Sequence, residues 1–315
     1  MGPGSRAIGP PAYREVEFAS AGVMLRGRLY GEASSRPPGP AIVMAHGLSA
    51  TISGMVADLY AEAFAAAGLR VLLYDHRSFG TSDGAPRHQI DKWLQTRGYI
   101  DAVSYCLSLA DVDADRVAVW GDSLSAPLAM IAAAVEDRVA AVVVQVPGFG
   151  SEMPAAEADE QTFEQLREML LADDLAERER TVSEPGPVVS PDQLAMPSRL
   201  TPITAFRWFI EFGGRFESGW ENRVTSAEIV TSVRLDPVRC ASHITVPTLM
   251  VTAHPDEMPN CDPDVALAVL GLVTGPTESL KIGGGHFGLL YPDSPHFTRT
   301  VEAQSDFLRR HLALS

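Results

Sequence analysis

The chain has 315 residues, and 46% of them are hydrophobic, which is enough to bury one large core with an inserted subdomain. Its 40 acidic and 25 basic residues give a formal net charge of −15, which disfavours nucleic acid or an anionic membrane as a partner. The three cysteines are far apart without a CxxC pair, so we expect neither disulfides nor structural zinc. No apolar run approaches the roughly 20 residues that span a bilayer, and we expect a cytoplasmic protein.

The first elements predict the start of a mixed sheet. Residues 13–19 and 23–30 alternate apolar and polar side chains across a short turn, which predicts an antiparallel hairpin at a sheet edge. A Pro-rich loop follows. The continuous apolar run at 41–47 ends in glycine, as expected for a strand that is buried on both faces.

Strands and helices then alternate along the chain. Helical patterns are predicted at 55–68, 96–110 and 124–135, and strands at 69–75, 116–121 and 139–147. This alternation predicts βαβ crossovers and a mostly parallel sheet with helices on both faces. The fold class is therefore α/β.

The pattern is interrupted between residues 150 and 234. This stretch contains acidic helical sequence, a Pro-rich segment and an aromatic segment, after which strands are predicted at 247–253 and 279–282 with helices at 264–273 and 301–312. We expect a first core part at 11–149, an inserted helical cap at 150–234 and a second core part at 235–315. Such a cap would cover the strand ends where open α/β sheets bind ligands.

Ser123 is the candidate nucleophile. The sequence Gly-Asp-Ser-Leu-Ser at 121–125 lies directly after a predicted strand and directly before a predicted helix. Small residues at Gly121 and Ser125 permit a tight, strained turn that projects the Ser123 hydroxyl above the sheet. Ser125 stands where the motif usually has a second glycine. The assignment of Ser123 as the nucleophile therefore depends on the predicted strand before the motif and the predicted helix after it.

A serine nucleophile needs a histidine base held by a third group. Of the eight histidines, His286 follows the last predicted strand in a glycine-rich loop and comes after Ser123 in the order Ser, acid, His. His46 and His76 end strands but precede the serine, and His46 is better explained as a support for the loop at 47–48. His254 is too close to the best acid. The remaining histidines are expected to be loop, helix or surface residues: His88, His243, His296 and His311.

Asp256 is the candidate acid because it lies in the first loop after the strand predicted at 247–253. A carboxylate there can face a histidine that arrives from the next strand end. Glu257, Asp262 and Asp264 belong to the same acidic loop and are its competitors. No third ligand at a useful spacing joins His254 and Asp256, so we expect no metal, and no cofactor is required.

The backbone amides of Leu48 and Leu124 are the candidate oxyanion donors, because one follows the first buried strand and the other follows the nucleophile. Asp122, Trp208 and Phe212 are the candidate substrate contacts. Asp122 could instead bond the local backbone. The cap aromatics could equally pack the cap onto the body, and they are Phe206, Trp208, Phe209, Phe212, Phe216 and Trp220.

Several segments together resemble the α/β-hydrolases, and more narrowly the YcjY-like hydrolases and the polyketide transferase-like, dienelactone hydrolase-related enzymes. They cover nearly the whole chain outside the first half of the cap: 45–50 (AHGLSA), 74–87 (YDHRSFGTSDGAPR), 90–102 (IDKWLQTRGYIDA), 120–126 (WGDSLSA), 221–225 (ENRVT) and 283–288 (GGGHFG). The resemblance implies a Ser, Asp, His triad, and relatives also carry serine at the position of Ser125. Two departures are Ser78, where the family usually has glycine, and Ala126-Pro127, where it has two glycines.

The leading functional hypothesis is cleavage of an ester, thioester or lactone of a moderately apolar small molecule through an acyl-serine intermediate. The alternative is acyl transfer, cyclisation or elimination in polyketide biosynthesis with the same triad. A non-catalytic binding protein is disfavoured by the apparently complete triad. The expected partner is a small acyl substrate, free or carrier-bound, and the expected assembly is a monomer or a homodimer.

Overall fold

The computed structural model describes residues 13–31, 38–154 and 160–313. The first two residues of the core part predicted at 11–149 therefore lie outside the described residues. Eight strands form the main sheet in the order β1-β2-β4-β3-β6-β7-β10-β11. Their bounds are β1 Tyr13–Ser20, β2 Val23–Tyr30, β3 Gly39–Ala45, β4 Arg70–Tyr74, β6 Val112–Asp122, β7 Val139–Gln145, β10 Thr248–Ala253 and β11 Thr277–Ile282.

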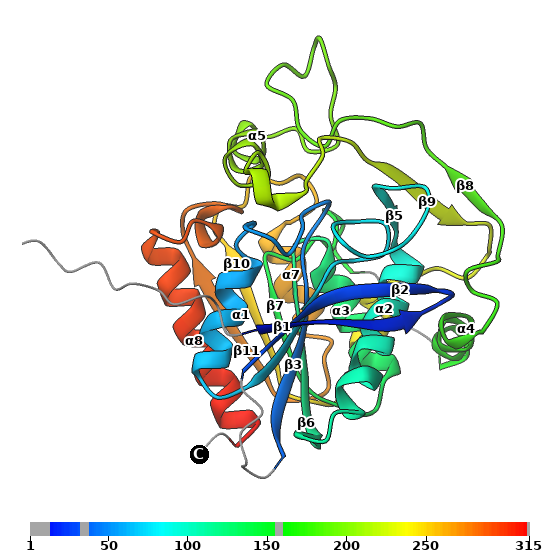
Figure 1. Ribbon diagram of the computed structural model, residues 1–315, viewed down its shortest axis with the longest axis vertical. Helices are drawn as coiled ribbons and strands as arrows, with labels where there is room; N and C mark the ends of the chain where they lie inside the picture. Colours follow the sequence, from blue (N-terminus) through cyan, green and yellow to red (C-terminus); the bar gives the residue numbers. More distant parts are fainter. Residues whose placement is uncertain (1–12, 32–37, 155–159, 314–315) are drawn as a thin grey trace, which may run out of the picture.

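The predicted hairpin and parallel sheet are both present. Strands β1 and β2 pair antiparallel, β2 pairs antiparallel with β4, and the pairs from β4 to β11 are parallel. The central strands β3 and β6 are apolar on both faces because helices cover both sides of the sheet (Figure 1). The carboxyl ends of the parallel strands consequently point to one edge.

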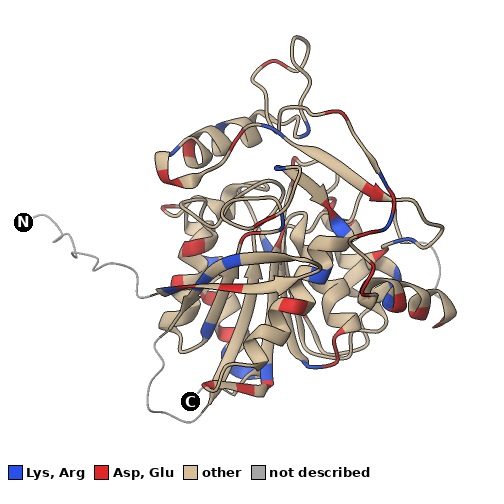
Figure 2. Ribbon diagram, turned by 45° about the vertical axis from the view of Figure 1, so that its right-hand side comes forward, with Lys and Arg blue, Asp and Glu red and all other residues tan. Residues whose placement is uncertain are grey.

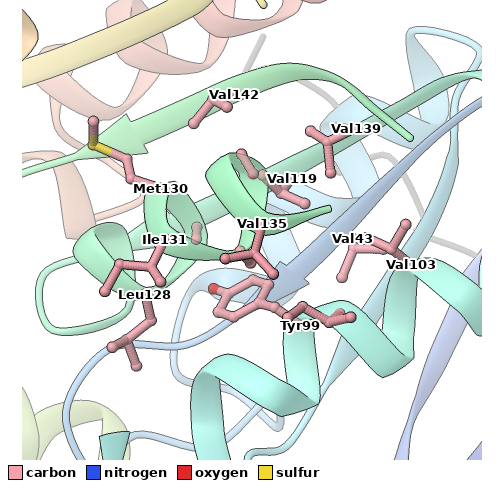
Figure 3. Packing of buried hydrophobic residues seen from close by; sticks show 14 of the residues in the cluster. Val43, Tyr99, Val103, Val119, Leu128, Met130, Ile131, Val135, Val139 and Val142 are labelled. Carbon is pink, nitrogen blue, oxygen red and sulfur yellow. The ribbon is translucent and has the colours of Figure 1, made fainter. Parts of the chain in front are cut away.

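Helices pack on both faces of this sheet, as the alternating pattern predicts. One hydrophobic cluster joins one face of the sheet to α1 and α8, and the other joins the opposite face to α2, α3, α6 and α7. Figure 3 shows Val43 and Val119 of the strands near Tyr99 of α2. The helix bounds are α1 Ala57–Ala66, α2 Lys92–Leu107, α3 Ser125–Val135, α6 Pro237–Ala241, α7 Pro263–Leu270 and α8 Pro295–His311.

Helix α2 begins at Lys92, four residues before its predicted start. Asp91 caps the helix, because its side chain accepts a hydrogen bond from the Leu94 amide. An aspartate at this position satisfies an otherwise unpaired amide and stabilises a helix by about 1 kcal/mol. Tyr99 of the same helix is buried, and its hydroxyl donates to the Trp120 carbonyl at 2.9 Å, which fixes the helix against β6.

The inserted segment is not wholly helical, which corrects the prediction of a helical cap. It contains α4 (Glu160–Leu171), α5 (Ile203–Trp208), a π-helical turn at Phe209–Gly213 and a 3-10 turn at Phe216–Ser218. It also contributes β8 (Arg180–Val182) and β9 (Thr225–Ile229), which form a second sheet with β5 (Gln89–Asp91) of the body. Backbone pairing between β5 and β9 thus fixes the cap beside the start of α2 (Figure 1).

Charged positions are scattered over the ribbon, and Lys and Arg do not gather in one band in the view of Figure 2. No helix within the described ranges has both the length and the apolar character needed to cross a membrane.

Candidate active site

Ser123 lies in a strained turn between β6 and α3. Its φ of 51° is in the left-handed region, which non-glycine residues rarely adopt. The Ser123 amide donates to the Gln145 carbonyl at 3.0 Å, and the Ser123 carbonyl accepts from the Gly148 amide at 3.1 Å. A Cβ on Gly121 would lie 2.5 Å from the Ser125 carbonyl oxygen, so the turn requires glycine there. The turn therefore has the geometry of a nucleophile elbow.

Ser125 explains how serine can replace the usual glycine of the motif. Its buried hydroxyl donates to the His46 carbonyl and lies 2.8 Å from Nε2 of His76. These bonds join the elbow to the loops after β3 and β4. His46 is itself buried, with Nε2 3.5 Å from Asp75 Oδ1 and Nδ1 2.9 Å from the Gly47 carbonyl oxygen. It therefore supports the loop at 47–48, as the sequence predicts.

The structure brings Ser123, His286 and Asp256 into one hydrogen-bonded chain. His286 Nε2 lies 3.0 Å from Ser123 Oγ, and His286 Nδ1 lies 2.9 Å from Oδ2 and 3.1 Å from Oδ1 of Asp256. The imidazole and the carboxylate are 2% and 1% exposed, respectively. A base within reach of the hydroxyl and a buried acid on the far side of the ring are what serine nucleophiles need.

The competing carboxylates have other contacts. Glu257 accepts from the His286 amide at 2.7 Å and from the Thr204 hydroxyl at 2.6 Å, so it holds the histidine loop and not the ring. Asp262 caps α7, and Asp264 is exposed. Asp256 alone of these four faces the imidazole.

Two cavities meet at Ser123. The larger, of about 580 Å³, lies within the range typical of small-molecule sites and is lined mainly by apolar residues. The smaller, of about 30 Å³, lies beside His286. Both are lined by Leu48, Ser123, Leu200 and Met258. The nucleophile thus faces a space large enough for a substrate and lies beside its base.

Leu48 and Leu124, the candidate oxyanion residues, both line the larger cavity together with Ser123. Pro127, part of the departure from two glycines, also lines this cavity and narrows it relative to a glycine. Ser78, the other departure, has a φ of 68° and donates its hydroxyl to the Gln89 carbonyl at 2.8 Å. Its side chain therefore supports β5.

The three predicted substrate contacts have different surroundings. Asp122 is buried beside the smaller cavity with no hydrogen-bond partner for Oδ1 among the described residues, and burial raises its pKa to about 6. Trp208 lines the same cavity and donates to the Leu290 carbonyl at 3.0 Å. Phe212 lines neither cavity at Ser123 and instead packs against Trp208 and Tyr291, so it is a packing residue, contrary to the prediction.

The remaining cap aromatics divide in the same way. Phe209 lines the smaller cavity, whereas Trp220 packs on Phe209 and donates to the Ser49 hydroxyl at 3.0 Å. Phe206 is half-buried against the hydrophobic cluster that contains α1 and α8, and Phe216 is fully exposed. Cap packing therefore accounts for part of the aromatic segment, whereas Trp208 and Phe209 line a cavity beside Ser123 and stay candidate substrate contacts.

Cys261 is a neighbour of the triad that the sequence analysis did not single out. Its sulfur and the side-chain ligand atoms of Asp256 and His286 all lie within 4.8 Å of one another, and the thiol lines the larger cavity. Such a trio resembles a metal-ligand set, but Asp256 and His286 are already bonded to each other and to Ser123. No spacing motif marks Cys261, because the loop after β10 folds it back to the site.

The surroundings of His286 predict an alkaline pH profile. Burial lowers the pKa of His286, but Cys261 and Asp256 outweigh burial and raise it above its ordinary value. Only the neutral imidazole can accept the serine proton, so kcat/KM should rise with pH through this pKa, with a midpoint above about 6.5. Cys261→Ala removes one raising neighbour and should move the midpoint of a kcat/KM against pH curve to lower pH.

Cys240→Ala is the matched control, because Cys240 is also a buried thiol but lies on α6. It should leave the midpoint where the parent enzyme has it. Asp122 also faces His286, so the fit should allow for a second ionisation near its pKa of about 6. An identical midpoint in the parent and in Cys261→Ala would contradict this account.

Comparisons with known proteins agree with this geometry. Residues 40–221 match the family model described as the alpha/beta hydrolase fold. The chain is 32% identical to the thiohydrolase apmlB of Arthrinium phaeospermum, with 95% of this chain and 97% of that protein covered. It is 29% identical to the polyketide transferase af380 of Aspergillus fumigatus, with 95% and 98% covered.

The solved structure of the alpha/beta hydrolase GrgF from a Penicillium species superposes with a TM-score of 0.71 at 26% identity, covering 96% of this chain and 99% of that one. The resemblance thus extends over the body and the cap together. The family model matches more than half of the chain, and the strand order of the sheet and the strained turn at Ser123 agree with that match. The protein therefore belongs to the α/β-hydrolase family.

Proposed function

We propose that this enzyme is a serine hydrolase that cleaves an ester, thioester or lactone of a moderately apolar small molecule. The observation that carries the proposal is the 3.0 Å approach of His286 Nε2 to Ser123 Oγ at the junction with a mainly apolar cavity of about 580 Å³. The hydroxyl has a base within reach, and the cavity has room for an acyl group.

In the acylation half-reaction, Ser123 Oγ attacks the substrate carbonyl carbon while His286 Nε2 takes the hydroxyl proton. The carbonyl oxygen becomes an oxyanion, which the amides of Leu48 and Leu124 stabilise. Asp256 holds the ring and stabilises the imidazolium. The bond to the leaving group then breaks, and His286 returns the proton to the departing oxygen or sulfur.

In the deacylation half-reaction, His286 takes a proton from water, and the resulting nucleophile attacks the acyl-Ser123 carbonyl. Collapse of the second tetrahedral intermediate breaks the bond to Ser123 Oγ, which recovers the proton from His286. The products are a carboxylic acid and an alcohol or thiol. No metal or cofactor enters either half-reaction.

Acyl transfer, cyclisation or elimination in polyketide biosynthesis is the second candidate. Two observations favour it: the similarity to a named polyketide transferase, and a cavity that cap residues Arg199, Leu200 and Thr201 help to enclose. Enclosure limits the access of water to the acyl-enzyme, which would favour an alcohol, amine or internal nucleophile as acceptor. Both candidates use the same acyl-Ser123 intermediate.

The setting of the reaction is part of the proposal. Cys106, Cys240 and Cys261 are all free thiols, which suits a reducing cytoplasm. The acyl substrate would arrive free or on a carrier, and the enzyme would act as a monomer or homodimer away from nucleic acid and membranes.

The experiment that tests the proposal combines labelling with turnover. A fluorophosphonate should phosphonylate Ser123, and peptide mass spectrometry should locate the adduct there. His286→Ala should slow labelling by about 10²-fold or more, because it removes the base. His254→Ala is the matched control, since His254 is in the neighbouring loop and bonds Thr252 instead of the serine, and it should label at the parent rate.

Turnover of a panel of aryl esters and thioesters then separates the two candidates. Release of free acid by the unlabelled enzyme, lost once Ser123 is phosphonylated, supports the hydrolase. Formation of an ester or amide, with the leaving group released only when an alcohol or amine acceptor is added, supports the transferase. Folded protein that fails to label at Ser123 would refute both.

A further inference from the structure

The larger cavity has a charge opposite to that of the protein as a whole. Among the residues that line it, Lys92 and Arg199 are cationic and none is acidic. The chain as a whole carries 40 acidic and 25 basic residues. The cavity lining thus has no carboxylate, although the protein as a whole is strongly acidic. Its apolar walls have a low dielectric constant, and they focus a positive potential inside the cavity.

Both cations are available to a ligand. Lys92 is half-buried at the first position of α2, and Arg199 is exposed in the cap. Within the described part of the chain, neither side chain forms an ion pair or a side-chain hydrogen bond, whereas many of the other arginines do. The carboxylate nearest in sequence, Asp91, is bound by Arg180 and caps α2, so it does not neutralise Lys92.

The position of the two cations explains how one ligand can meet both. Lys92 follows β5, which pairs with β9 of the inserted segment, and Arg199 belongs to that segment. The cavity therefore has one cation from the body and one from the cap. Its remaining lining is mainly apolar and includes Leu124, Pro127 and Met258.

We propose that the natural substrate carries an anionic group, a carboxylate or a phosphate, at a distance from the scissile carbonyl, and that Lys92 and Arg199 bind this group while the apolar walls bind the connecting chain. This inference rests on the proposed function, because the scissile bond must be placed at Ser123. It deepens that function by assigning specificity to two residues outside the triad. A charged hydrogen bond of this kind contributes about tenfold to binding.

The anion has two chemical sources, and matched substrate pairs distinguish them. A carboxylate on the acyl group is tested by p-nitrophenyl half-esters of adipic and suberic acids against p-nitrophenyl hexanoate and octanoate. A phosphate on the leaving group is tested by hexanoyl-coenzyme A against the neutral hexanoyl-N-acetylcysteamine. We expect the anionic member of at least one pair to have the higher kcat/KM, with a preference that weakens as salt is added.

The variants Lys92→Met and Arg199→Gln should each lower the ratio of anionic to neutral kcat/KM by about tenfold, mainly through a higher KM for the anionic member. Because both residues line the substrate cavity, circular dichroism and thermal unfolding check that each variant is folded. Lys281→Met is the matched control, because Lys281 is exposed on β11 and does not line the cavity, and it should keep the parent preference.

The inference and the proposed function fail in different ways. If the neutral member of both pairs is preferred, or if both variants keep the parent ratio of anionic to neutral kcat/KM, the anion site is refuted. Ser123-dependent turnover of neutral esters would in that case still support the proposed hydrolase function. If no substrate of either kind is turned over through Ser123, the proposed function itself fails.

Discussion

Replacing Ser123 with alanine is expected to lower kcat for an aryl ester by about 10⁶-fold, the scale of loss found when a triad nucleophile is removed. The loss is large because the acyl-enzyme cannot form without Oγ, while His286 and Asp256 remain hydrogen-bonded to each other. Substrate binding should change little, since the cavity walls are intact. Single-turnover kinetics and an equilibrium binding measurement on the same variant check both expectations.

Ser125→Ala is the informative comparison, because it deletes a hydroxyl from the same turn. Ser125 bonds His46 and His76 and lies outside the triad. We expect this variant to keep most of its activity and to lose stability, since two buried polar partners lose a bond. Equal losses of kcat in the two serine variants would mean that the turn, and not the Ser123 hydroxyl, accounts for the effect.

The parts of the fold that the sequence predicts are those encoded locally. A strand, a strained turn and a helix are adjacent at Ser123, so their residue pattern reveals the elbow without knowledge of the fold. The same holds for the alternating strands and helices of the body. Asp256 follows the buried strand β10 and His286 follows the neighbouring edge strand β11. Because parallel strands end at one edge of a sheet, the proximity of the two residues could be anticipated.

The parts that escape prediction depend on contacts between distant segments. Strands β5 and β8 have three residues each, too few for a period of two to be recognised, and they exist because β9 pairs with both. Lys92 and Arg199 are unremarkable in sequence and become neighbours of one cavity only when the inserted segment folds over the body. Phe212 was misassigned because an aromatic side chain gives no sign of which face of its turn meets the substrate.

Asp256→Asn is expected to lower kcat by about 10⁴-fold with a smaller effect on KM. The asparagine oxygen can still accept from the Met258 amide, which Asp256 Oδ1 does now at 2.9 Å, so the loop keeps its shape. The amide NH₂, however, would donate to His286 Nδ1 and favour the tautomer with its proton on Nε2. That nitrogen could no longer take the proton of Ser123, and the imidazolium would lose its counter-charge.

Two neighbouring carboxylates separate this electronic role from a general effect of acidic charge in the loop. Asp264→Asn makes the same chemical change at an exposed position and should leave kcat unchanged. Glu257→Gln weakens the hold on the His286 amide and should have an intermediate effect, because it displaces the ring without altering its tautomer. Steady-state kinetics on the three variants should therefore rank Asp256 above Glu257 and Glu257 above Asp264. If Asp256→Asn loses no more activity than Glu257→Gln, the loop only positions the histidine, and the acid of the triad must be sought elsewhere.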